Sequence, residues 1–353
     1  MRRKAVVAMS GGVDSSVAAA LMKDAGYDVT GIMLKLWRGA ALNNESGCCS
    51  VDAAEDARRV AQVLDIPFYV LNFAERFDET VVNEFTRAYA KGRTPNPCVA
   101  CNRGIKFRAL LDRARTYGAD VFATGHYARI EEASGKYRLR RAADPAKDQS
   151  YVLYMLRQPE LAVTKFPVGE YSKPEIREIA SSLGLRTAAK PESQDICFVP
   201  NGDTHAFLRE AVPQGSRPGP IVDAAGRELG THRGFAHYTV GQRRGLGVGL
   251  GLPLYVREIN PRENTVVVGT RDEIVSRTLQ LEDLTFVGDP ERVLRAAVVT
   301  RYRGRGAAAT VRTEGRTAEV EFDEPQPPSA AGQSAVFYAG DEVLGGGIIS
   351  RAA

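Results

Sequence analysis

The segment Ala8-Met9-Ser10-Gly11-Gly12-Val13-Asp14-Ser15-Ser16 joins an expected strand, residues 4–9, to an expected alanine-rich helix, residues 15–25. Glycines let the backbone approach an anion, and the N-terminus of a helix offers unbonded N–H groups and a partial positive charge. Three serines add hydroxyl donors. The segment therefore predicts a phosphate-binding turn, although an ordinary strand-to-helix turn favours the same residue types. Its spacing is neither that of the Walker loop nor that of the dinucleotide fingerprint.

Asp14 is the unusual residue of this turn, because a carboxylate would repel bound phosphates. We therefore expect its side chain to reach Mg²⁺ or a water molecule.

Strand-like and helix-like patterns alternate over the first two hundred residues. Further strands are expected at residues 29–36, 67–71 and 121–124, and further helices at residues 51–64, 77–91 and 108–117. This alternation predicts an open, mostly parallel α/β sheet. Ligands bind such sheets at the carboxyl ends of the strands, where the phosphate-binding turn begins.

The pattern changes after residue 200, where glycine and proline become frequent. Short strands are expected at residues 221–223, 254–259 and 265–268, and then at 295–300, 308–312, 318–322, 334–338 and 343–349. The last five suggest a small barrel or sandwich, with residues 323–328 as a loop inside it. The expected architecture is an α/β domain (residues 1–200), a small mixed domain (201–278) and a C-terminal β-barrel (279–353).

The composition is that of a soluble globular protein, with 44% hydrophobic and 25% charged residues in a chain of 353. At about 150 residues per domain, this length predicts two or three domains. No apolar run approaches the roughly 18 residues that a membrane-spanning helix needs. The apolar stretch near the N-terminus is too short for a signal peptide. We expect a cytoplasmic protein with no membrane partner.

Arginine is unevenly distributed. The net charge is only +4, but residues 292–316 contain seven arginines against one acidic residue, and residues 103–115 contain five cations against one. Clustered arginine suits phosphate contacts with a nucleic acid. For either stretch taken alone, a solvated basic face is the alternative.

The cysteines form the second informative pattern. Five cysteines, an odd number in a chain of this kind, indicate catalytic or metal-binding thiols rather than a disulfide scaffold. Cys98 and Cys101 lie in Thr94-Pro95-Asn96-Pro97-Cys98-Val99-Ala100-Cys101-Asn102, and the cations that follow favour their thiolate forms. Cys197 is a third candidate. Cys48 and Cys49 are adjacent, so their side chains diverge, and we expect ordinary loop or packing residues.

Three interpretations of Cys98, Cys101 and Cys197 compete. A structural zinc site would need a fourth ligand that the histidine spacing does not offer. A thioredoxin-like motif normally opens a helix after a strand, whereas this one follows Pro-Asn-Pro. In sulfur transfer, one cysteine would bear a persulfide and another would attack it or the substrate.

Several motifs together resemble a known family. Ser10-Gly11-Gly12-Val13-Asp14-Ser15 resembles the PP-loop of ATP pyrophosphatases, which have an adenine nucleotide hydrolase-like fold. With residues 94–102, 123–128, 147–151, 190–198 and 332–338, the chain resembles tRNA-specific 2-thiouridylases from Ala5 to Ser350. The resemblance implies a transferase that thiolates the wobble uridine (U34) of tRNA at C2. ATP would adenylate the C2 oxygen, release pyrophosphate and leave as AMP.

The resemblance also implies roles for individual residues. The nucleophile falls on Cys101 and the persulfide on Cys197. The ATP-binding residues are Ala8, Met9, Ser10, Gly11, Gly12, Val13, Asp14, Ser15, Leu34 and Gly125. The target base would meet Asn96, Pro97 and Cys98, and the tRNA would meet His126, Lys147, Asp148, Gln149, Arg301, Tyr302 and Gln333. Cys101 and Cys197 would form a disulfide bond only if the distance between them allows it.

Cys98 departs from the usual form of the family, which often has an aspartate there as general base. A cysteine is a poorer base near neutral pH. The three thiolates of Cys98, Cys101 and Cys197 could instead bind a [4Fe-4S] cluster whose open iron holds sulfide. Ligand count alone does not fix a metal, so a persulfide relay and a cluster both remain open.

The implied cofactors are ATP and Mg²⁺, and the implied partners are the anticodon stem-loop of tRNA and a sulfur-donor protein. The glycine-rich, basic segment 239–247 is either an RNA contact or a plain surface turn. A small-molecule PP-loop ligase or amidotransferase is the alternative enzyme, although it leaves the cysteines unexplained. A non-catalytic RNA-binding module with a structural metal leaves the PP-loop unexplained.

Overall fold

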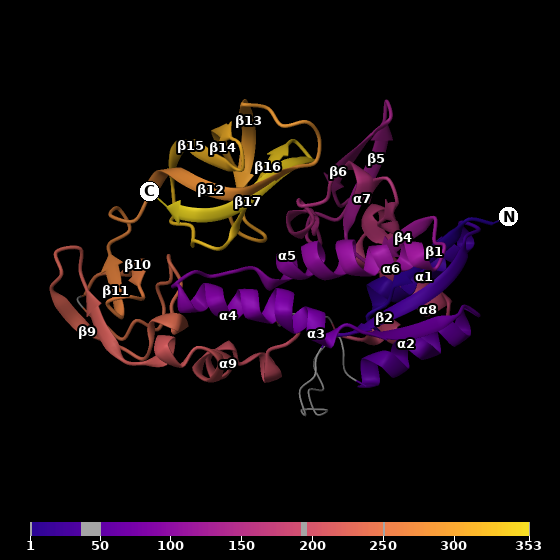
Figure 1. Ribbon diagram of the computed structural model, residues 1–353, viewed down its shortest axis with the longest axis horizontal. Coiled ribbons are helices and arrows are strands. Elements are labelled where there is room, and N and C mark those ends of the chain that lie inside the picture. The colour runs from indigo at the N-terminus through magenta and orange to yellow at the C-terminus, as the bar shows by residue number, and fades with distance from the viewer. Residues whose placement is uncertain (1, 37–50, 192–195, 250, 353) are drawn as a thin grey trace.

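The computed structural model describes residues 2–36, 51–191, 196–249 and 251–352. An α/β domain lies at one end of an elongated molecule, a small four-stranded sheet lies at the other, and a β-barrel lies between them on one side (Figure 1). This agrees with the predicted α/β class, followed by a mixed region and a C-terminal barrel.

The α/β domain is built on a five-stranded parallel sheet of order β3-β2-β1-β4-β7. Its strands are β1 (Lys4–Ala8), β2 (Asp28–Lys35), β3 (Phe68–Asn72), β4 (Val121–Thr124) and β7 (Thr164–Lys165). The chain lays β2 and β3 on one side of β1, and β4 and β7 on the other. The strand order therefore reverses between β1 and β4, and the crevice at their carboxyl ends is the usual ligand site of such a sheet.

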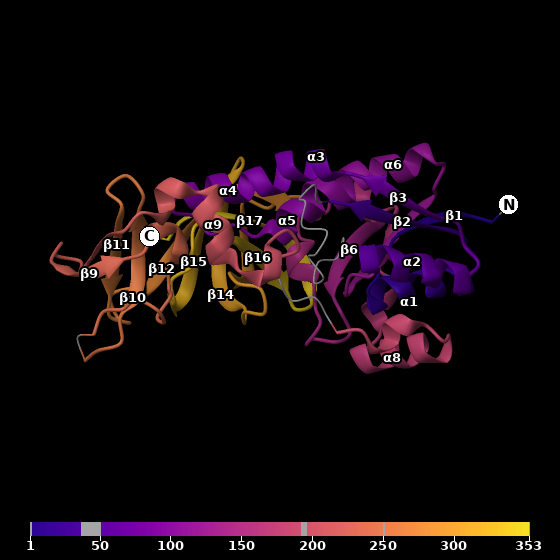
Figure 2. The same cartoon turned by 90° about the horizontal axis from the view of Figure 1, so that it is seen from below.

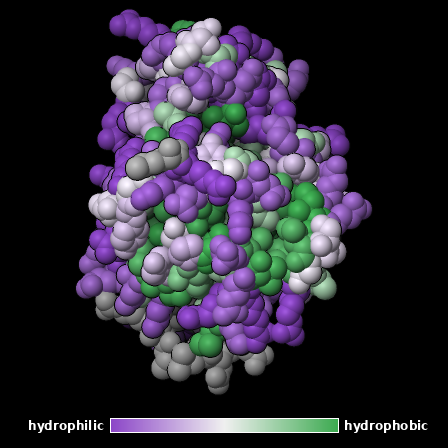
Figure 3. Space-filling view, turned by 90° about the vertical axis from the view of Figure 1, so that its right-hand side faces the viewer, coloured by the Kyte–Doolittle hydropathy of each residue, from purple (hydrophilic) through white to green (hydrophobic). Residues whose placement is uncertain are grey.

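Helices cover both faces of this sheet. Figure 2 shows α1 (Val13–Asp24), α2 (Val51–Val63) and α8 (Lys173–Ser182) on one side, and α3 (Ala74–Phe77) and α6 (Leu111–Thr116) on the other. β3 is the edge strand, and its Tyr69 and Val70 stay exposed. Figure 3 views this end of the molecule and shows apolar surface bordered by hydrophilic residues. Among the described helices, none is long and apolar enough to cross a membrane.

Two helical segments are longer than the sequence indicated. The helix expected at residues 77–91 begins with α3 at Ala74, passes through a π-helical segment, Asp78–Val82, and ends with α4 (Asn83–Ala90). The helix expected at residues 108–117 begins instead at Pro97 with α5 (Pro97–Cys101). It continues through the π-helical segment Asn102–Leu110 into α6. Cys98 and Cys101 therefore lie in the first turns of a helix.

A hairpin that the sequence analysis did not predict follows β4. It consists of β5 (Ala128–Ala133) and β6 (Lys136–Arg141), and the short helix α7 (Gln158–Leu161) comes after it. β6 pairs with a strand of the barrel through the register Val343 to Leu139. The hairpin thereby joins the α/β domain to the barrel.

The small sheet is mixed, with order β10-β11-β8-β9. Its strands are β8 (Gly219–Val222), β9 (Glu228–His232), β10 (Tyr255–Asn260) and β11 (Thr265–Gly269), of which β8 and β11 run parallel. The helix α9 (Thr204–Ala211) precedes them, although short alternating runs were expected to replace helices here. Asp203 caps it by accepting a hydrogen bond from the N–H of Ala206 at 2.9 Å.

Six antiparallel strands close the barrel, one more than expected. They are β12 (Ser276–Phe286), β13 (Val293–Val299), β14 (Ala307–Glu314), β15 (Thr317–Gln326), β16 (Ser334–Ala339) and β17 (Glu342–Ala352), and pairing of β12 with β17 completes the ring. The prediction that residues 323–328 form a loop was wrong for Asp323–Gln326. β15 extends through them because Gln326 pairs with Ser276 of β12, the strand that the sequence analysis missed.

Candidate functional site

The phosphate-binding turn lies at the carboxyl end of β1. The hydroxyl of Ser15 accepts a hydrogen bond from the N–H of Ser10 at 3.0 Å and donates to the carbonyl of Gly12 at 3.0 Å. Gly11 has a φ of +72°, and a Cβ there would lie 2.2 Å from the carbonyl oxygen of Ala53. Only glycine fits at this position, because the turn packs directly against the backbone of helix α2.

Gly125 brings β4 to the same turn. A Cβ on Gly125 would lie 2.6 Å from the backbone nitrogen of Ser15, so this glycine is needed for the close approach. Met9, Val13 and Leu34 are buried around the turn, Ala8 is half-buried, and Ser10 is exposed. Nine of the ten residues predicted to bind ATP thus lie in this turn or directly after β4, at the switch point between β1 and β4, and Leu34 lies near the carboxyl end of the neighbouring strand β2.

Asp14 contacts a lysine that the sequence analysis did not select. Both of its carboxylate oxygens accept from Nζ of Lys173, at 2.7 and 2.9 Å, and the hydroxyl of Tyr127 donates to Oδ1 at 2.6 Å. Lys173 is only 7% exposed. A protein cation thus pairs with this carboxylate, and the contact of Asp14 with Mg²⁺ or a water stays a prediction. Lys173 is distant in sequence, so no local pattern indicated it.

Lys190 forms a second link to the turn. Its Nζ donates to the carbonyl of Gly11 at 3.1 Å and forms an ion pair with Asp56 at 2.7 Å. Lys190 begins the predicted motif 190–198, of which residues 192–195 lie outside the described residues, as do Cys48 and Cys49.

The cysteine motif forms the start of α5 because Asn96 caps it. Oδ1 of Asn96 accepts from the N–H of Cys98 at 3.1 Å and of Val99 at 3.4 Å, and Pro97 occupies the first helical position. This arrangement leaves Cys98 exposed and Cys101 buried. The three residues predicted to meet the target base are therefore consecutive at one helix N-terminus.

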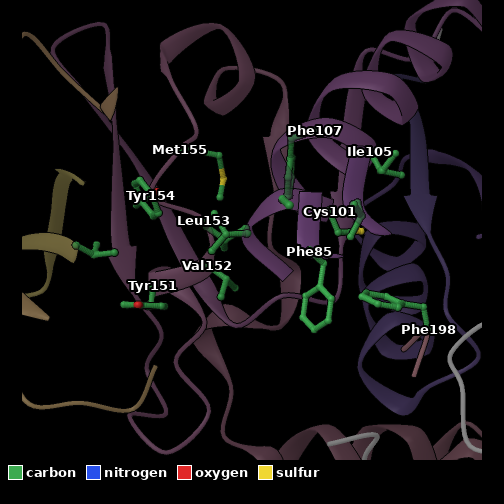
Figure 4. Close-up of a cluster of buried hydrophobic side chains, with 14 of the residues drawn as sticks. Phe85, Cys101, Ile105, Phe107, Tyr151, Val152, Leu153, Tyr154, Met155 and Phe198 are labelled. Carbon is green, nitrogen blue, oxygen red and sulfur yellow. The ribbon is translucent and has the colours of Figure 1, made fainter. Parts of the chain in front are cut away.

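Cys197 is positioned by its neighbour Phe198, which is 1% exposed. The Phe198 ring packs edge-on against Phe77, Phe85 and Phe207, with centroids 5.7, 5.2 and 5.5 Å away. Figure 4 shows Phe198, Phe85 and Cys101 in one hydrophobic cluster, and Cys197 lies half-buried at its border. The packing brings the segment of Cys197 to the helix of Cys101, although the two are far apart in sequence.

The three cysteines are present as thiols, so the structure does not support a disulfide bond between Cys101 and Cys197. Within residues 2–36, 51–191, 196–249 and 251–352, no group of three or more His, Cys, Asp or Glu side chains is placed to hold a metal ion. The side chains of Cys98, Cys101 and Cys197, one exposed, one buried and one half-buried, therefore do not converge as a ligand set in this conformation.

The segment before Cys98 contacts all three parts of the molecule. Thr94 donates its N–H to the carbonyl of Ala331 and accepts from the side chain of Gln333, both at 2.8 Å. Its hydroxyl also lies 3.2 Å from that of Thr239, which precedes the small sheet's β10. The preceding Arg93 binds Glu282 of β12. The cysteine helix therefore begins where the α/β domain, the barrel and the small sheet meet.

Three of the predicted tRNA contacts, Asp148, Gln149 and Gln333, make hydrogen bonds inside the protein. Asp148, whose side chain is 8% exposed, pairs with Arg141 at 3.0 Å and accepts from the N–H and hydroxyl of Ser150. The side chain of Gln149 accepts from the N–H of Tyr127 at 2.9 Å, and Gln333 contacts Thr94 as described. These residues shape the site from within, and their RNA contacts stay predictions.

Other predicted tRNA contacts lie nearer the surface. Lys147 is half-buried, and Tyr302 is 39% exposed with its ring 6.0 Å from that of Tyr151. Burial raises the pKa of Tyr302, against the opposing effect of the charge and hydrogen bond of Arg303. Arg301 donates to the carbonyl of Pro328 at 2.6 Å.

His126, also predicted to meet tRNA, is buried and packs against the rings of both Phe107 and Phe166. Its Nδ1 lies 2.6 Å from the hydroxyl of Thr124, and its Nε2 lies 3.5 Å from Nζ of Lys106. Burial and then the charge of Lys106 lower the pKa of His126 well below 6.5, so its ring is neutral near pH 7.

Comparison with known proteins accounts for nearly the whole chain. Residues 3–201 match the tRNA methyl transferase HUP domain, residues 205–270 the tRNA methyl transferase PRC-barrel domain, and residues 276–349 the aminomethyltransferase beta-barrel domain. The tRNA-specific 2-thiouridylase MnmA of Moorella thermoacetica is 49% identical over 355 residues, covering 99% of each chain. That of Carboxydothermus hydrogenoformans is 50% identical over 359 residues, covering 99% of this chain and 98% of its own.

Solved structures show only distant likeness. A 4-thiouridine synthetase in complex with RNA and ATP is 20% identical with a TM-score of 0.38, covering 60% of this chain and 51% of that one. NMN synthetase from Francisella tularensis is 17% identical with a TM-score of 0.33, covering 54% of this chain and 66% of that one. The extent of the sequence matches is decisive instead: the chain belongs to the tRNA-specific 2-thiouridylase family.

Proposed function

We propose that this chain is a sulfurtransferase that uses ATP to convert the wobble uridine, U34, of tRNA to 2-thiouridine. One observation supports this best. The segment that begins the cysteine helix is bonded at Thr94 to the barrel and to the small sheet. An RNA bound on the surface of the barrel would therefore present a base to Cys98 and Cys101.

The first step is activation of the uridine. ATP would lie with its phosphates on the turn Ser10–Gly12, where backbone N–H groups at the start of α1 receive negative charge. The C2 oxygen attacks the α-phosphorus, and pyrophosphate leaves. Uridine then bears AMP at C2, which is a much better leaving group than oxygen. Mg²⁺ would neutralise charge on the triphosphate, and Asp14, whose carboxylate accepts from Lys173 in the structure, would reach the ion or one of its water molecules.

The second step is sulfur transfer. The terminal sulfur of a persulfide on Cys197 attacks C2 and displaces AMP, giving a disulfide between Cys197 and the base. The thiolate of Cys101 then attacks the Cys197 sulfur, which releases 2-thiouridine and joins the two cysteines transiently. An external thiol restores both thiols, the state described here. A sulfur-donor protein would reload Cys197 as a persulfide before the next turnover.

Cys98 has a different role in this scheme. It is exposed at the second position of α5, beside Asn96 and Pro97, where it would line the pocket for the base. The described residues do not form a three-thiol ligand set, and the proposed relay uses no iron–sulfur cluster. Iron analysis of anaerobically purified protein separates the two schemes. About four irons per chain, lost in Cys98→Ala, would replace the relay with a cluster.

The experiment that tests the function is reconstitution with unmodified tRNA transcript, ATP and a persulfide donor. We expect 2-thiouridine at position 34, with loss of product in Cys101→Ser and Cys197→Ser. Pyrophosphate release should depend on tRNA in the wild type. Release that is equally fast without tRNA would instead favour a small-molecule PP-loop ligase. Wild-type yields of 2-thiouridine from Cys197→Ser would refute the assignment of the persulfide.

The proposed division of labour follows the three parts of the chain. Residues 1–200 would bind ATP and perform the chemistry, residues 201–278 would link the two other parts, and residues 279–353 would bind tRNA. Since ATP and tRNA are both substrates, the proposed reaction takes place in the cytoplasm.

A further inference from the structure

Six of the seven arginines of residues 292–316 fall into two sets. Three of them bind a carboxylate of the barrel at 2.6 to 2.7 Å: Arg295 with Asp323, Arg312 with Glu321 and Arg316 with Asp283. Three others lie in the exposed loop between β13 and β14: Arg301, Arg303 and Arg305. For this second set, no ion pair with an acidic residue occurs in the described part of the chain. The second set therefore retains its charge for a ligand.

A second loop has the same character. Arg243 and Arg244 are exposed in the segment 239–246, and neither forms an ion pair with any acidic residue that the structure describes. The segment is held at both ends. The N–H of Gly241 and the carbonyl of Gln242 bond to Val256 of β10 at 2.8 and 2.9 Å, and Leu246 is buried. The two arginines thus occupy a fixed, exposed stretch between anchored ends.

The two loops are in contact with each other. A Cβ on Gly241, whose φ is +85°, would lie 2.9 Å from Nη2 of Arg301. Thr239 of the same segment contacts Thr94, four residues before Cys98, at 3.2 Å between hydroxyl oxygens. Segment 239–246 therefore bridges the arginine loop of the barrel and the start of the cysteine helix.

We infer that Arg243 and Arg244 bind the phosphodiester backbone of the RNA strand that enters the Cys98 pocket. The inference rests on the proposed function, and it adds the small sheet to the RNA-binding surface. Guanidinium groups bind phosphate oxygens in a bidentate way, and clustered arginines without carboxylate partners repel one another until a polyanion neutralises them. A strand that passes the arginines of both loops meets a continuous basic surface and reaches the cysteine helix at its end.

The test compares Arg243→Gln/Arg244→Gln with wild type in binding to an unmodified tRNA transcript over a series of salt concentrations. Each lost phosphate contact lowers the slope of log K against log salt by roughly 0.7 to 0.9. We expect the slope to fall by about 1.4 to 1.8 and the affinity near physiological salt to fall about tenfold. Affinity for ATP should not change. The charge-retaining variant Arg243→Lys/Arg244→Lys should keep the wild-type slope.

Arg227→Gln is the matched control. Arg227 is also an exposed arginine of the small sheet, with its side chain 80% exposed, but it pairs with Asp223 at 2.7 Å. It should leave both affinity and slope unchanged. If wild type binds and thiolates tRNA while the double glutamine variant matches it in affinity and slope, this inference is overturned and the proposed function stands. If wild type itself does not bind tRNA, both fail together.

Discussion

Lys173 and Asp14 form a bidentate ion pair inside the α/β domain, with Nζ 2.7 Å from Oδ1 and 2.9 Å from Oδ2. The lysine comes from the first turn of α8 and the aspartate from the phosphate-binding turn. A carboxylate in that turn would otherwise repel a triphosphate. The positive charge of Lys173 therefore balances the negative charge of Asp14 before a nucleotide binds.

Replacing Lys173 with methionine should weaken ATP binding by roughly tenfold or more. The substitution leaves the carboxylate of Asp14 without its cation, and partly buried charges interact more strongly than charges in water. Titration calorimetry measures the effect. Lys165→Met is the control, because Lys165 is an exposed lysine at the end of β7 in the same sheet.

A double-mutant cycle shows whether the charge itself is responsible. Asp14→Asn removes the unpaired carboxylate, so Lys173→Met should cost much less ATP affinity in the Asp14→Asn background than in wild type. Equal losses in the two backgrounds would mean that Lys173 acts independently of Asp14.

Asn96 should have two separable functions. Asn96→Ala removes the cap of the helix that contains Cys98 and Cys101, which costs about 1 kcal/mol in free energy of unfolding. Asn96→Asp keeps an acceptor at the cap and should restore this stability. Thiolation should remain low in both variants if the amide also contacts the target base, as measured by 2-thiouridine formed per minute. Full activity of Asn96→Asp would restrict Asn96 to its capping role.

Phe198→Ala should loosen the attachment of Cys197. The Phe198 ring is almost wholly buried among three other phenylalanines, and such truncations cost about 3 to 5 kcal/mol. We expect a lower urea midpoint, and faster reaction of Cys197 with a thiol reagent in a background where the other four cysteines, Cys48, Cys49, Cys98 and Cys101, are replaced. Phe198→Leu retains most of the apolar volume, so its urea midpoint and its Cys197 reaction rate should lie between those of Phe198 and Phe198→Ala. An unchanged rate for Cys197 in Phe198→Ala would show that the ring does not position the thiol.

Local sequence patterns predicted the features that depend on local interactions. The parallel sheet and the phosphate-binding turn follow from alternating strands and helices, and from Gly11 at a position with positive φ. The start of α5 also has a local signal, Asn96 in the cap and Pro97 after it, but the sequence analysis assigned these residues to the target base and placed the helix at residues 108–117.

Features that depend on distant partners were not predictable from the sequence. The carboxyl-terminal end of β15 is a strand because β12 pairs with it, although Asp323–Gln326 is rich in acidic residues and proline. Lys173 follows an ordinary capping residue, Ser172, and nothing near it indicates that Asp14 is its partner. In the same way, the sequence shows seven arginines close together, but it does not show which of these arginines form ion pairs with carboxylates in the fold.

The neutral His126 should make stability depend on pH. Its folded-state pKa lies well below 6.5, chiefly because burial disfavours the imidazolium and also because Lys106 repels it. In the unfolded chain the pKa returns to about 6.5. Above that pH the ring is neutral in both states, so the full stabilisation is present. As the pH falls below 6.5 the unfolded chain gains a proton that the folded chain does not, and stability is lost.

The measurement is the free energy of unfolding of wild type and His126→Asn from pH 7.5 to 5. Asparagine offers a polar atom to Thr124 but does not titrate, and the other histidines contribute equally to both proteins. The difference in free energy of unfolding between wild type and His126→Asn should be constant above pH 7. Below pH 6.5 it should shrink, by at most about 1.4 kcal/mol per pH unit. An advantage that stays constant down to pH 5 would mean that His126 accepts a proton as readily in the folded protein as in the unfolded chain. Its position against Phe107 and Phe166 would then not be the apolar, closed environment described here.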